Sequence, residues 1–226
     1  MIAEVARSAR WQSHTKPHPA DEIMFDSRLR NYDDLFLTLA LAPLGERRLL
    51  DVGCANGKWL EICCHRWGAR QIHCSGNDKR EDRWRDWRQT NPRTGITFVL
   101  KPTHELDFAP HSFDIVHQSM MLSSIVNSET RTRTAEVLWR LLRPSGILIS
   151  YDFWLNPINP GTVGIDWAEL QRLFPHGRKI YSRSLTLAPP FGRKLTMLRK
   201  PVLLALEKLR LMNSHLLVAL KRTQEH

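Results

Sequence analysis

One short stretch, residues 49–57 with the sequence LLDVGCANG, constrains the fold of this chain more than any other. Its first four residues, Leu49–Val52, predict a short buried parallel strand because they are mostly apolar. Gly53 and Gly57 punctuate the turn that follows, where the absence of a Cβ lets the backbone approach a ligand. From Lys58 onward apolar residues recur at helical spacing, so the turn opens a helix whose first N–H groups are unpaired. A strand, a glycine turn and a helix in this order predict a site for a nucleotide-like cofactor.

The second predicted strand places an acidic residue near this turn. The strand covers Gln71–Ser75, and the chain then reaches Gly76, Asn77 and Asp78. Asp78 follows Gly57 by 21 residues. In nucleotide-binding α/β folds an acidic residue at about this separation binds a ribose hydroxyl. The spacing therefore makes Asp78 the candidate ribose ligand.

The spacing of the glycines separates the classes of cofactor that use such a turn. Dinucleotide sites follow G-x-G-x-x-G, whereas this chain has Ala55 at the second position and Lys58 at the third. Phosphate-binding loops place four residues between their glycines and then Lys with Ser or Thr. Here only three residues separate the glycines, and Trp59 follows Lys58. Both classes are therefore disfavoured.

The remaining pattern resembles motif I of the class I S-adenosylmethionine-dependent methyltransferases, usually D-x-G-x-G-x-G. Asp51, Gly53 and Gly57 match it. Ala55 replaces the middle glycine, a change that is accommodated if its φ is negative. The stretch LDFAPHSFDIV is similar to the family's LPFPDxSFDxV signature, and LWRLLRPSGILISYDF is similar to its LKPGG turn with the flanking helix and strand. The resemblance spans about residues 32–222.

The resemblance implies an α/β fold, a Rossmann-like, mostly parallel sheet of seven strands with an antiparallel final strand and helices on both faces. Hydrophobic patterns predict strands at 49–52, 71–75, 96–100, 113–117, 147–151, 179–187 and 216–221. They predict helices at 21–41, from 58, and at 78–90, 128–142, 166–174 and 191–210. We expect a flexible segment at 1–20 and a single domain at 21–226. Within it, 21–43 forms a lid helix with Leu35 and Leu37 packed inward.

Carried over residue by residue, the resemblance implies S-adenosylmethionine as the donor, S-adenosylhomocysteine as the product and no metal. The implied donor contacts come from the glycine turn and the ends of the next three strands: Asp51, Gly53, Cys54, Ala55, Gly57, Asp78, Lys79, Thr103, His104, Gln118 and Ser119. The chain departs from the family at two places. Pro102 and Thr103 stand where an Asp and a small residue are usual, and Leu122-Ser123-Ser124 replaces Leu-His-His.

The candidate catalytic and acceptor residues follow from the chemistry and from the ends of the strands. Methyl transfer from a sulfonium is an in-line displacement, so the protein must hold the acceptor in line and exclude water. A hydroxyl acceptor also needs a base. Ligands of open α/β sheets bind beyond the carboxyl ends of the strands, which makes Asp152 a candidate base or orienting residue. His117 is either a second catalytic candidate or a buried core residue, and the candidate substrate contacts are Tyr32, Tyr151 and Trp154.

Composition limits the number of domains and the cellular compartment that we expect for this chain. Its 226 residues, 42% of them hydrophobic, suit one α/β domain. The cysteines show no metal-site spacing and are expected to be reduced thiols of a cytoplasmic protein: Cys54, Cys63, Cys64 and Cys74. No apolar run reaches the ~20 residues of a membrane span. The basic amphipathic stretch 193–210 leaves peripheral membrane contact open, with cover for one sheet face as the alternative. The sequence does not indicate an oligomeric state.

The favoured function is methyl transfer to a small hydroxylated acceptor, as in O-methylation of a sugar or a secondary metabolite. Segments 151–154, 172–175 and 186–190 resemble a group of bacterial methyltransferase-domain proteins associated with glycan and small-metabolite modification. The net charge of +10 keeps an RNA methyltransferase as an alternative, although the Asn/Asp-Pro-Pro-Tyr/Phe motif of many base N-methylating members is missing. The changes at Ala55, Pro102 and Ser123 keep a non-catalytic scaffold with this fold as a further alternative.

Overall fold

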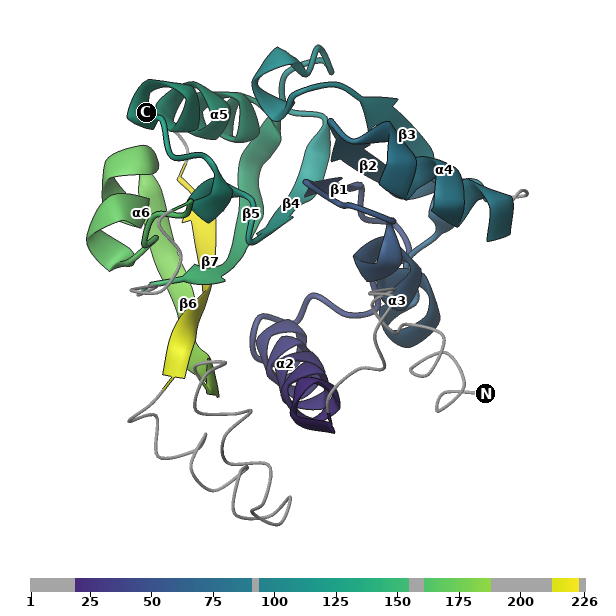
Figure 1. Cartoon of the computed structure of the whole chain (residues 1–226), viewed down its shortest axis with the longest axis horizontal. Coiled ribbons are helices and arrows are strands. Elements are labelled where there is room, and N and C mark those ends of the chain that lie inside the picture. Colours follow the sequence, from purple (N-terminus) through teal and green to yellow (C-terminus); the bar gives the residue numbers. More distant parts are fainter. Residues whose placement is uncertain (1–18, 91–93, 155–160, 188–212, 224–226) are drawn as a thin grey trace.

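The computed structural model describes residues 19–90, 94–154, 161–187 and 213–223 (Figure 1). Its strands are β1 (Leu49–Val52), β2 (Cys74–Asp78), β3 (Thr97–Leu100), β4 (Phe113–Ser119), β5 (Leu142–Phe153), β6 (Gly177–Leu187) and β7 (Asn213–Arg222). Its α-helices are α2 (Pro19–Thr38), α3 (Lys58–Trp67), α4 (Glu81–Thr90), α5 (Ser128–Leu141) and α6 (Trp167–Leu173). Short 3-10 helices precede β2 and follow β3 and β4, namely η1 (Gln71–His73), η2 (Thr103–Glu105) and η3 (Leu122–Ser124).

The strands form one seven-stranded sheet in the order β3-β2-β1-β4-β5-β7-β6. The pairs among β1 to β5 are parallel, whereas β7 runs antiparallel to both β5 and β6. The predicted fold class, a mostly parallel sheet with an antiparallel final strand, is therefore confirmed. Because the parallel strands share one direction, their carboxyl ends meet at one edge of the sheet, where ligands of open α/β sheets bind.

Successive strand residues alternate between two apolar layers, as the pleat of a sheet requires. On one face Leu49 and Ile115 pack with residues of α2 and α3. On the other face Leu50 and Val116 pack with residues of α5 and α6. Helices on both faces explain why the central strands are apolar almost throughout. The exceptions are polar residues near the carboxyl ends of the strands.

Helix α2 lies between α3 and the β6–β7 end of the sheet (Figure 1). Its Asp33 carboxylate accepts two hydrogen bonds from Arg66 of α3, at 2.6 and 2.8 Å, and one from the Trp67 indole. The next residue, Asp34, accepts hydrogen bonds from Arg183 and Tyr181 of β6. Two adjacent carboxylates thus attach α2 to α3 on one side and to β6 on the other.

Leu37 corrects the expected inward face of this helix. Leu35 is fully buried, as predicted, together with Tyr32 and Phe36. Leu37 is 81% exposed, so the prediction that it packs inward was wrong. Two residues span about 200° of an α-helix, which places Leu35 and Leu37 on opposite sides.

Several predicted boundaries also need correction. Residues 71–73 form η1 rather than strand, and β2 begins at Cys74. Helix α4 begins at Glu81 rather than at 78. Strand β5 begins at Leu142 and runs through the predicted turn at 143–146, because Leu142 already pairs with Phe113 of β4. The predicted flexible segment, except residues 19 and 20, and the predicted helix at 191–210 lie outside the described residues.

Candidate active site

The turn after β1 has the backbone that a tight ligand-binding loop requires. Gly53 and Gly57 have φ of 65° and 70°, in the left-handed region that favours glycine. Gly57 is the N-cap of α3 and provides no side-chain cap, so the first N–H groups of α3 point into the loop without a side-chain partner. A Cβ on Gly53 would lie 2.8 Å from Cγ of Met121, which follows β4. The loops after β1 and β4 therefore meet closely.

Ala55 differs from what its replacement of glycine predicted. Its φ is +49° rather than negative, so the condition under which alanine fits without strain is not met. An alanine in the left-handed region costs about 1 kcal/mol relative to glycine. The N–H of Ala55 donates to Oδ2 of Asp78 at 2.8 Å, and this hydrogen bond offsets part of the cost.

The predicted ribose ligand lies beside this turn at the end of β2. Asp78 accepts the N–H of Ala55 on Oδ2 and the N–H of Arg80 on Oδ1, at 2.8 and 2.9 Å. A carboxylate offers roughly four acceptor positions, so about two remain for a ligand. The N–H of Cys54 also donates to the carbonyl of Asn77, at 2.9 Å, which fixes the turn against β2.

Asn77 is a site residue whose role sequence reasoning missed. It is fully buried, and its amide donates to the carbonyls of Val99 and Lys101 at 3.1 and 2.7 Å. Its Oδ1 accepts the hydroxyl of Thr103 at 2.7 Å. Thr103, predicted as a donor contact, is thereby fixed at the end of β3. The signal was available, because a buried asparagine needs partners for all of its polar atoms.

The other predicted residues beyond β2 and β3 lie at the surface. Lys79 and His104 are both exposed, and His104 lies 3.6 Å from Glu105. Both residues are close in sequence to the loop that Asp78 and Thr103 define. The structure therefore keeps all of the predicted β1, β2 and β3 residues along one part of the sheet edge.

A buried chain of side chains joins β1, β4 and α2. Nδ1 of His117 lies 2.7 Å from Oδ1 of Asp51, and Nε2 of His117 lies 2.7 Å from the Tyr32 hydroxyl. The register places His117 directly opposite Asp51. With Asp51 ionised, Nδ1–H donates to the carboxylate and Nε2 accepts from Tyr32. Burial raises the pKa of Asp51 and raises the pKa of Tyr32 well above its ordinary value.

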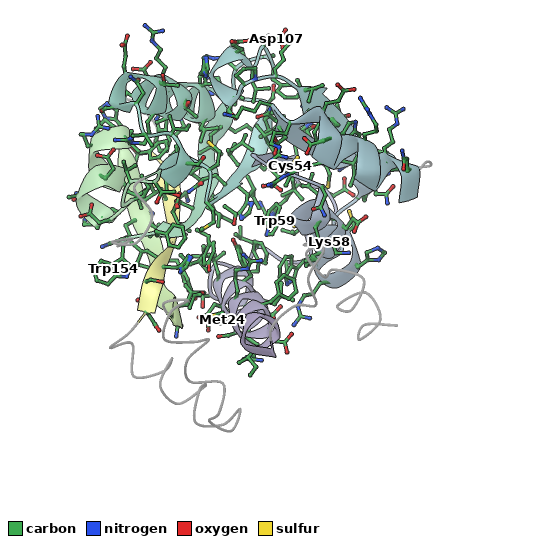
Figure 2. All side chains as sticks on the ribbon, in the orientation of Figure 1. Met24, Cys54, Lys58, Trp59, Asp107 and Trp154 are labelled. Atoms are coloured by element: carbon green, nitrogen blue, oxygen red, sulfur yellow. The ribbon has the colours of Figure 1, made fainter. Side chains whose placement is uncertain are left out.

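Trp59 of α3 packs against this row of hydrogen-bonded side chains. Its ring stacks on His117, with centroids 3.7 Å apart and an interplanar angle of 5°. Figure 2 shows Trp59 between the sheet and α2. Its indole Nε1 is buried and has no hydrogen-bond partner among the described residues. A buried donor without a partner is unfavourable in a protein alone, and a bound ligand would relieve it.

A second buried network lies on the opposite face of the sheet and joins β4 to β5. Oδ2 of Asp152 accepts the backbone N–H of Ser123 at 3.1 Å and the amide of Gln118 at 3.2 Å. The same amide donates to the Ser150 hydroxyl at 2.6 Å. Oε1 of Gln118 accepts the N–H groups of Met121 and Leu122, at 3.1 and 3.3 Å. Asp152 and Gln118 thus hold the loop after β4, which contains η3.

Burial also changes the acidity of Asp152. Desolvation raises its pKa to about 6, against hydrogen bonds from Ser123, Phe153 and Gln118 that favour the ionised form. The Oδ1 oxygen accepts the N–H of Phe153 at 3.0 Å, so both oxygens already have partners. Through these contacts Asp152 binds the N–H groups of Ser123 and Phe153. Ser119, the neighbouring predicted donor contact, is partly buried.

The predicted acceptor residues lie towards the β5–β7 side of the edge. The Tyr151 hydroxyl lies 2.8 Å from Oγ1 of Thr186, and its ring stacks on His215 with centroids 5.0 Å apart. Trp154 is 41% exposed, and its indole donates to the carbonyl of Asn213 at 2.9 Å. Tyr32 lies on the same face of the sheet as Tyr151. Tyr32 and Tyr151 therefore lie on the α2 face of the sheet, whereas Trp154 binds the start of β7.

Three further observations concern metals, membranes and cysteines. Within the described ranges no group of three or more His, Cys, Asp or Glu side chains is placed to hold a metal ion. None of the helices described here is long and apolar enough to cross a membrane. All four cysteines are free thiols.

The comparisons with known proteins agree with this geometry. Residues 49–146 match the family model described as a methyltransferase domain. These residues run from the start of β1 into β5, so they include the glycine turn, Asp78 and both buried networks in large part. A search among curated proteins found no match.

Solved structures of methyltransferases share the fold. An S-adenosylmethionine-dependent methyltransferase from Mesorhizobium loti has a TM-score of 0.60 at 19% identity, with 82% of this chain and 95% of that chain covered. The N-methyltransferase NodS from Bradyrhizobium japonicum WM9 has a TM-score of 0.63 at 15% identity, covering 88% and 97%. A SAM-dependent methyltransferase from Archaeoglobus fulgidus has 0.60 at 18% identity, covering 86% and 91%. These structures show that the chain has the fold of known methyltransferases, and the family model matches its part from β1 into β5.

Proposed function

We propose that the protein is an S-adenosylmethionine-dependent methyltransferase that methylates a hydroxyl group of a small acceptor, such as a sugar or a secondary metabolite. One observation carries the proposal: the Asp78 carboxylate lies against the backbone of a left-handed glycine turn within a segment that matches the methyltransferase domain. A nucleoside ligand needs such a carboxylate for its ribose and such a turn for close approach of the backbone.

The residues at the edge fit the donor. Asp78 retains acceptor capacity for ribose hydroxyls, and the uncapped N-terminus of α3 offers N–H groups to a carboxylate. We assign the donor contacts to the turn, with Asp51, Gly53, Cys54, Ala55 and Gly57, and to the strand ends, with Asp78, Lys79, Thr103, His104, Gln118 and Ser119. Among these, Gln118 acts through the groups that it holds, because both of its polar atoms have partners, and Asp51 acts through His117, which its Oδ1 binds.

S-adenosylmethionine supplies a methyl group on a sulfonium, which transfers by in-line displacement. The chain's task is to orient the acceptor and to receive its proton. We assign proton removal to the chain that ends at Tyr32, because the Tyr32 hydroxyl donates to Nε2 of His117 while its oxygen can accept a second hydrogen bond. Asp51 orients His117 from the other side. Asp152 orients the loop after β4, and Tyr151 and Trp154 contact the acceptor.

Calorimetry with S-adenosylhomocysteine tests the donor site. We expect wild type to bind, and Asp78→Ala to lose about 100-fold in affinity, because charge-assisted hydrogen bonds to the ribose disappear. Asp82→Ala is the matched control, because Asp82 is an exposed carboxylate of α4 that pairs with Arg80. Equal affinity of D78A and D82A for S-adenosylhomocysteine would contradict the assignment of Asp78 to the donor site. Failure of the wild-type protein to bind S-adenosylhomocysteine would contradict the proposed function.

The acceptor is tested with a labelled methyl group. Incubation with extracts of small hydroxylated metabolites should transfer label to an oxygen atom, identified by mass spectrometry and its stability to base. Tyr32→Phe should lower kcat about 100-fold with little change in the affinity for S-adenosylhomocysteine, because general base catalysis contributes about 100-fold or more. Label found on nitrogen would contradict O-methylation.

A further inference from the structure

Arg28 is a partly buried cation on α2 that no acidic side chain of the described residues neutralises. Two other charged residues of this helix form ion pairs. Asp33 pairs with Arg66, and Asp34 pairs with Arg183. The guanidinium of Arg28 instead lies over two rings, 5.2 Å from the centroid of Phe25 and 5.1 Å from that of Tyr151.

This packing leaves the hydrogen-bonding edge of the guanidinium available. A guanidinium is planar and stacks through its faces on aromatic rings, while its five N–H groups point outward in the plane. Two of these N–H groups match the two oxygens of a carboxylate or a phosphate. The aromatic contacts with Phe25 and Tyr151 therefore position Arg28 without using its donors.

The rings that the structure places near Arg28 belong to Phe25, Tyr151 and His215. The Tyr151 hydroxyl is paired with Thr186, and the Tyr151 ring stacks on His215. Burial, together with the positive charge of Arg28, lowers the pKa of His215 to about 3, so that this imidazole is neutral at pH 7. A cation in such an environment is poorly screened by water and attracts anions more strongly than an exposed one.

The position of Arg28 separates it from the donor end of the edge. Its ring contact Tyr151 belongs to β5, and His215 belongs to β7. In the sheet order β5 and β7 lie two and three places from β1. Neighbouring strands are about 4.8 Å apart, so these strands lie about 10 and 14 Å from the strand that carries the glycine turn. Arg28 thus lies on the side of the sheet edge that holds the predicted acceptor contact Tyr151.

We propose that Arg28 binds an anionic group, a carboxylate or a phosphate, of the methyl acceptor. The proposal rests on the proposed function, because it assigns this side of the edge to the acceptor. It narrows the acceptor class from hydroxylated small molecules to those that also carry an oxyanion, which the N–H groups of the guanidinium bind.

Anionic probes test this site directly. Benzoate and phenyl phosphate carry the two oxyanions on a flat ring, and benzyl alcohol is the neutral counterpart. Each is titrated into the full chain saturated with S-adenosylhomocysteine and followed by NMR or calorimetry. We expect at least one anion to bind, benzyl alcohol to bind at least 10-fold more weakly, and Arg28→Gln to weaken the anion about 10- to 100-fold.

Two further variants act as controls. Arg30→Gln removes the same charge from an exposed position of the same helix and should leave anion binding within about twofold. Arg28→Lys keeps the charge but loses the fork, and should bind the anion about 10-fold more weakly than wild type. If both anions bind no better than benzyl alcohol, or if R28Q and R30Q behave alike, the proposal is overturned.

The methyl donor also carries a carboxylate that Arg28 could bind. Two analogues of the donor, one with and one without this carboxylate, distinguish that case from binding of the acceptor. S-adenosylhomocysteine carries the carboxylate, whereas 5′-methylthioadenosine lacks it. We expect R28Q to bind both with wild-type affinity. A loss of about 10-fold for S-adenosylhomocysteine alone would assign Arg28 to the donor and overturn the proposal. Failure of wild type to bind S-adenosylhomocysteine would remove the proposed function, while the same anion titrations without it still decide whether Arg28 binds an oxyanion.

Discussion

Two buried polar networks meet at β4, on opposite faces of the sheet, and they differ in the groups that they hold. On the α2 and α3 face, Asp51 and His117 form a linear chain that ends at the hydroxyl of Tyr32 on α2. On the α5 and α6 face, Asp152 and Gln118 bind backbone N–H groups of the loop after β4. The first network joins a helix to the sheet through one side chain. The second fixes a piece of main chain at several points.

This difference separates two roles that the sequence alone assigned together. Asp152 and His117 were both candidate catalytic residues. A carboxylate with partners on both oxygens is suited to holding a loop in place. A chain that ends on a hydroxyl is suited to moving a proton, since a hydroxyl both donates and accepts. Neighbouring residues of β4, His117 and Gln118, thus belong to different networks, because a strand alternates its side chains between faces.

The largest expected effect comes from breaking the main-chain network. Gln118→Leu leaves the N–H groups of Met121 and Leu122 without their acceptor in a buried site. We expect the free energy of unfolding to fall by about 3–5 kcal/mol, measured by urea unfolding, because each unsatisfied buried group costs about 1–3 kcal/mol. Ser124→Ala, which removes an exposed hydroxyl bound to the Met121 carbonyl, should change it by less than about 0.5 kcal/mol. Similar losses in both variants would contradict the main-chain role.

Asp152 should make the protein less stable as the pH rises from about 4 to about 6. Burial raises its pKa from an ordinary 3.8 to about 6. Between these values the folded protein holds the proton and the unfolded chain has lost it. The free energy of unfolding therefore falls with rising pH, by about 3 kcal/mol at most from this group.

Asp152→Asn isolates this contribution, because it removes the titrating group. Urea unfolding of both proteins between pH 4 and pH 7 gives the difference in stability between wild type and variant. That difference should shift against wild type as the pH rises, and level off above the pKa of about 6. A difference that is independent of pH, or that shifts in favour of wild type, would show that Asp152 is not buried as described.

The fold was largely predictable because local patterns specify it. Strand β1 has the bounds Leu49–Val52 that its apolar run indicated, and α3 begins at Lys58, where helical spacing was predicted to begin. The prediction failed at residues 71–73, where Ile72 suggested a strand although its side chain is 65% exposed in η1. A single apolar residue does not distinguish a strand from a surface turn.

The candidate site was predictable only where it is local. The approach of Ala55 to Asp78 follows from the βαβ unit that carries both residues. The contact between Tyr32 and His117 joins positions 85 residues apart, and no spacing in the sequence indicates it. The same holds for Arg28 over Tyr151. Such contacts depend on where α2 docks, which the packing of the whole face decides.

Tyr32→Phe breaks the first network at the helix. The change leaves Nε2 of His117 buried without its hydrogen bond, which should lower the free energy of unfolding by about 2 kcal/mol. Amide hydrogen exchange should accelerate in α2 more than elsewhere, because the hydroxyl joins that helix to the sheet. Tyr151→Phe is the matched control, since its hydroxyl faces Thr186 of β6. Equal exchange of α2 in both variants would contradict the linking role of Tyr32.

The smallest effect is expected at the exposed rim of α2, where charge pairs rather than buried hydroxyls hold the helix. Hydrogen bonds from Arg66 and Trp67 outweigh burial and lower the pKa of Asp33, so the pair is formed at neutral pH. Because both side chains are more than a third exposed, Arg66→Gln should cost only about 0.5–1 kcal/mol in urea unfolding. The loss should shrink in 1 M salt, because salt screens exposed charges. A loss larger than that of Tyr32→Phe, or one insensitive to salt, would place the main attachment of α2 at its rim rather than at His117.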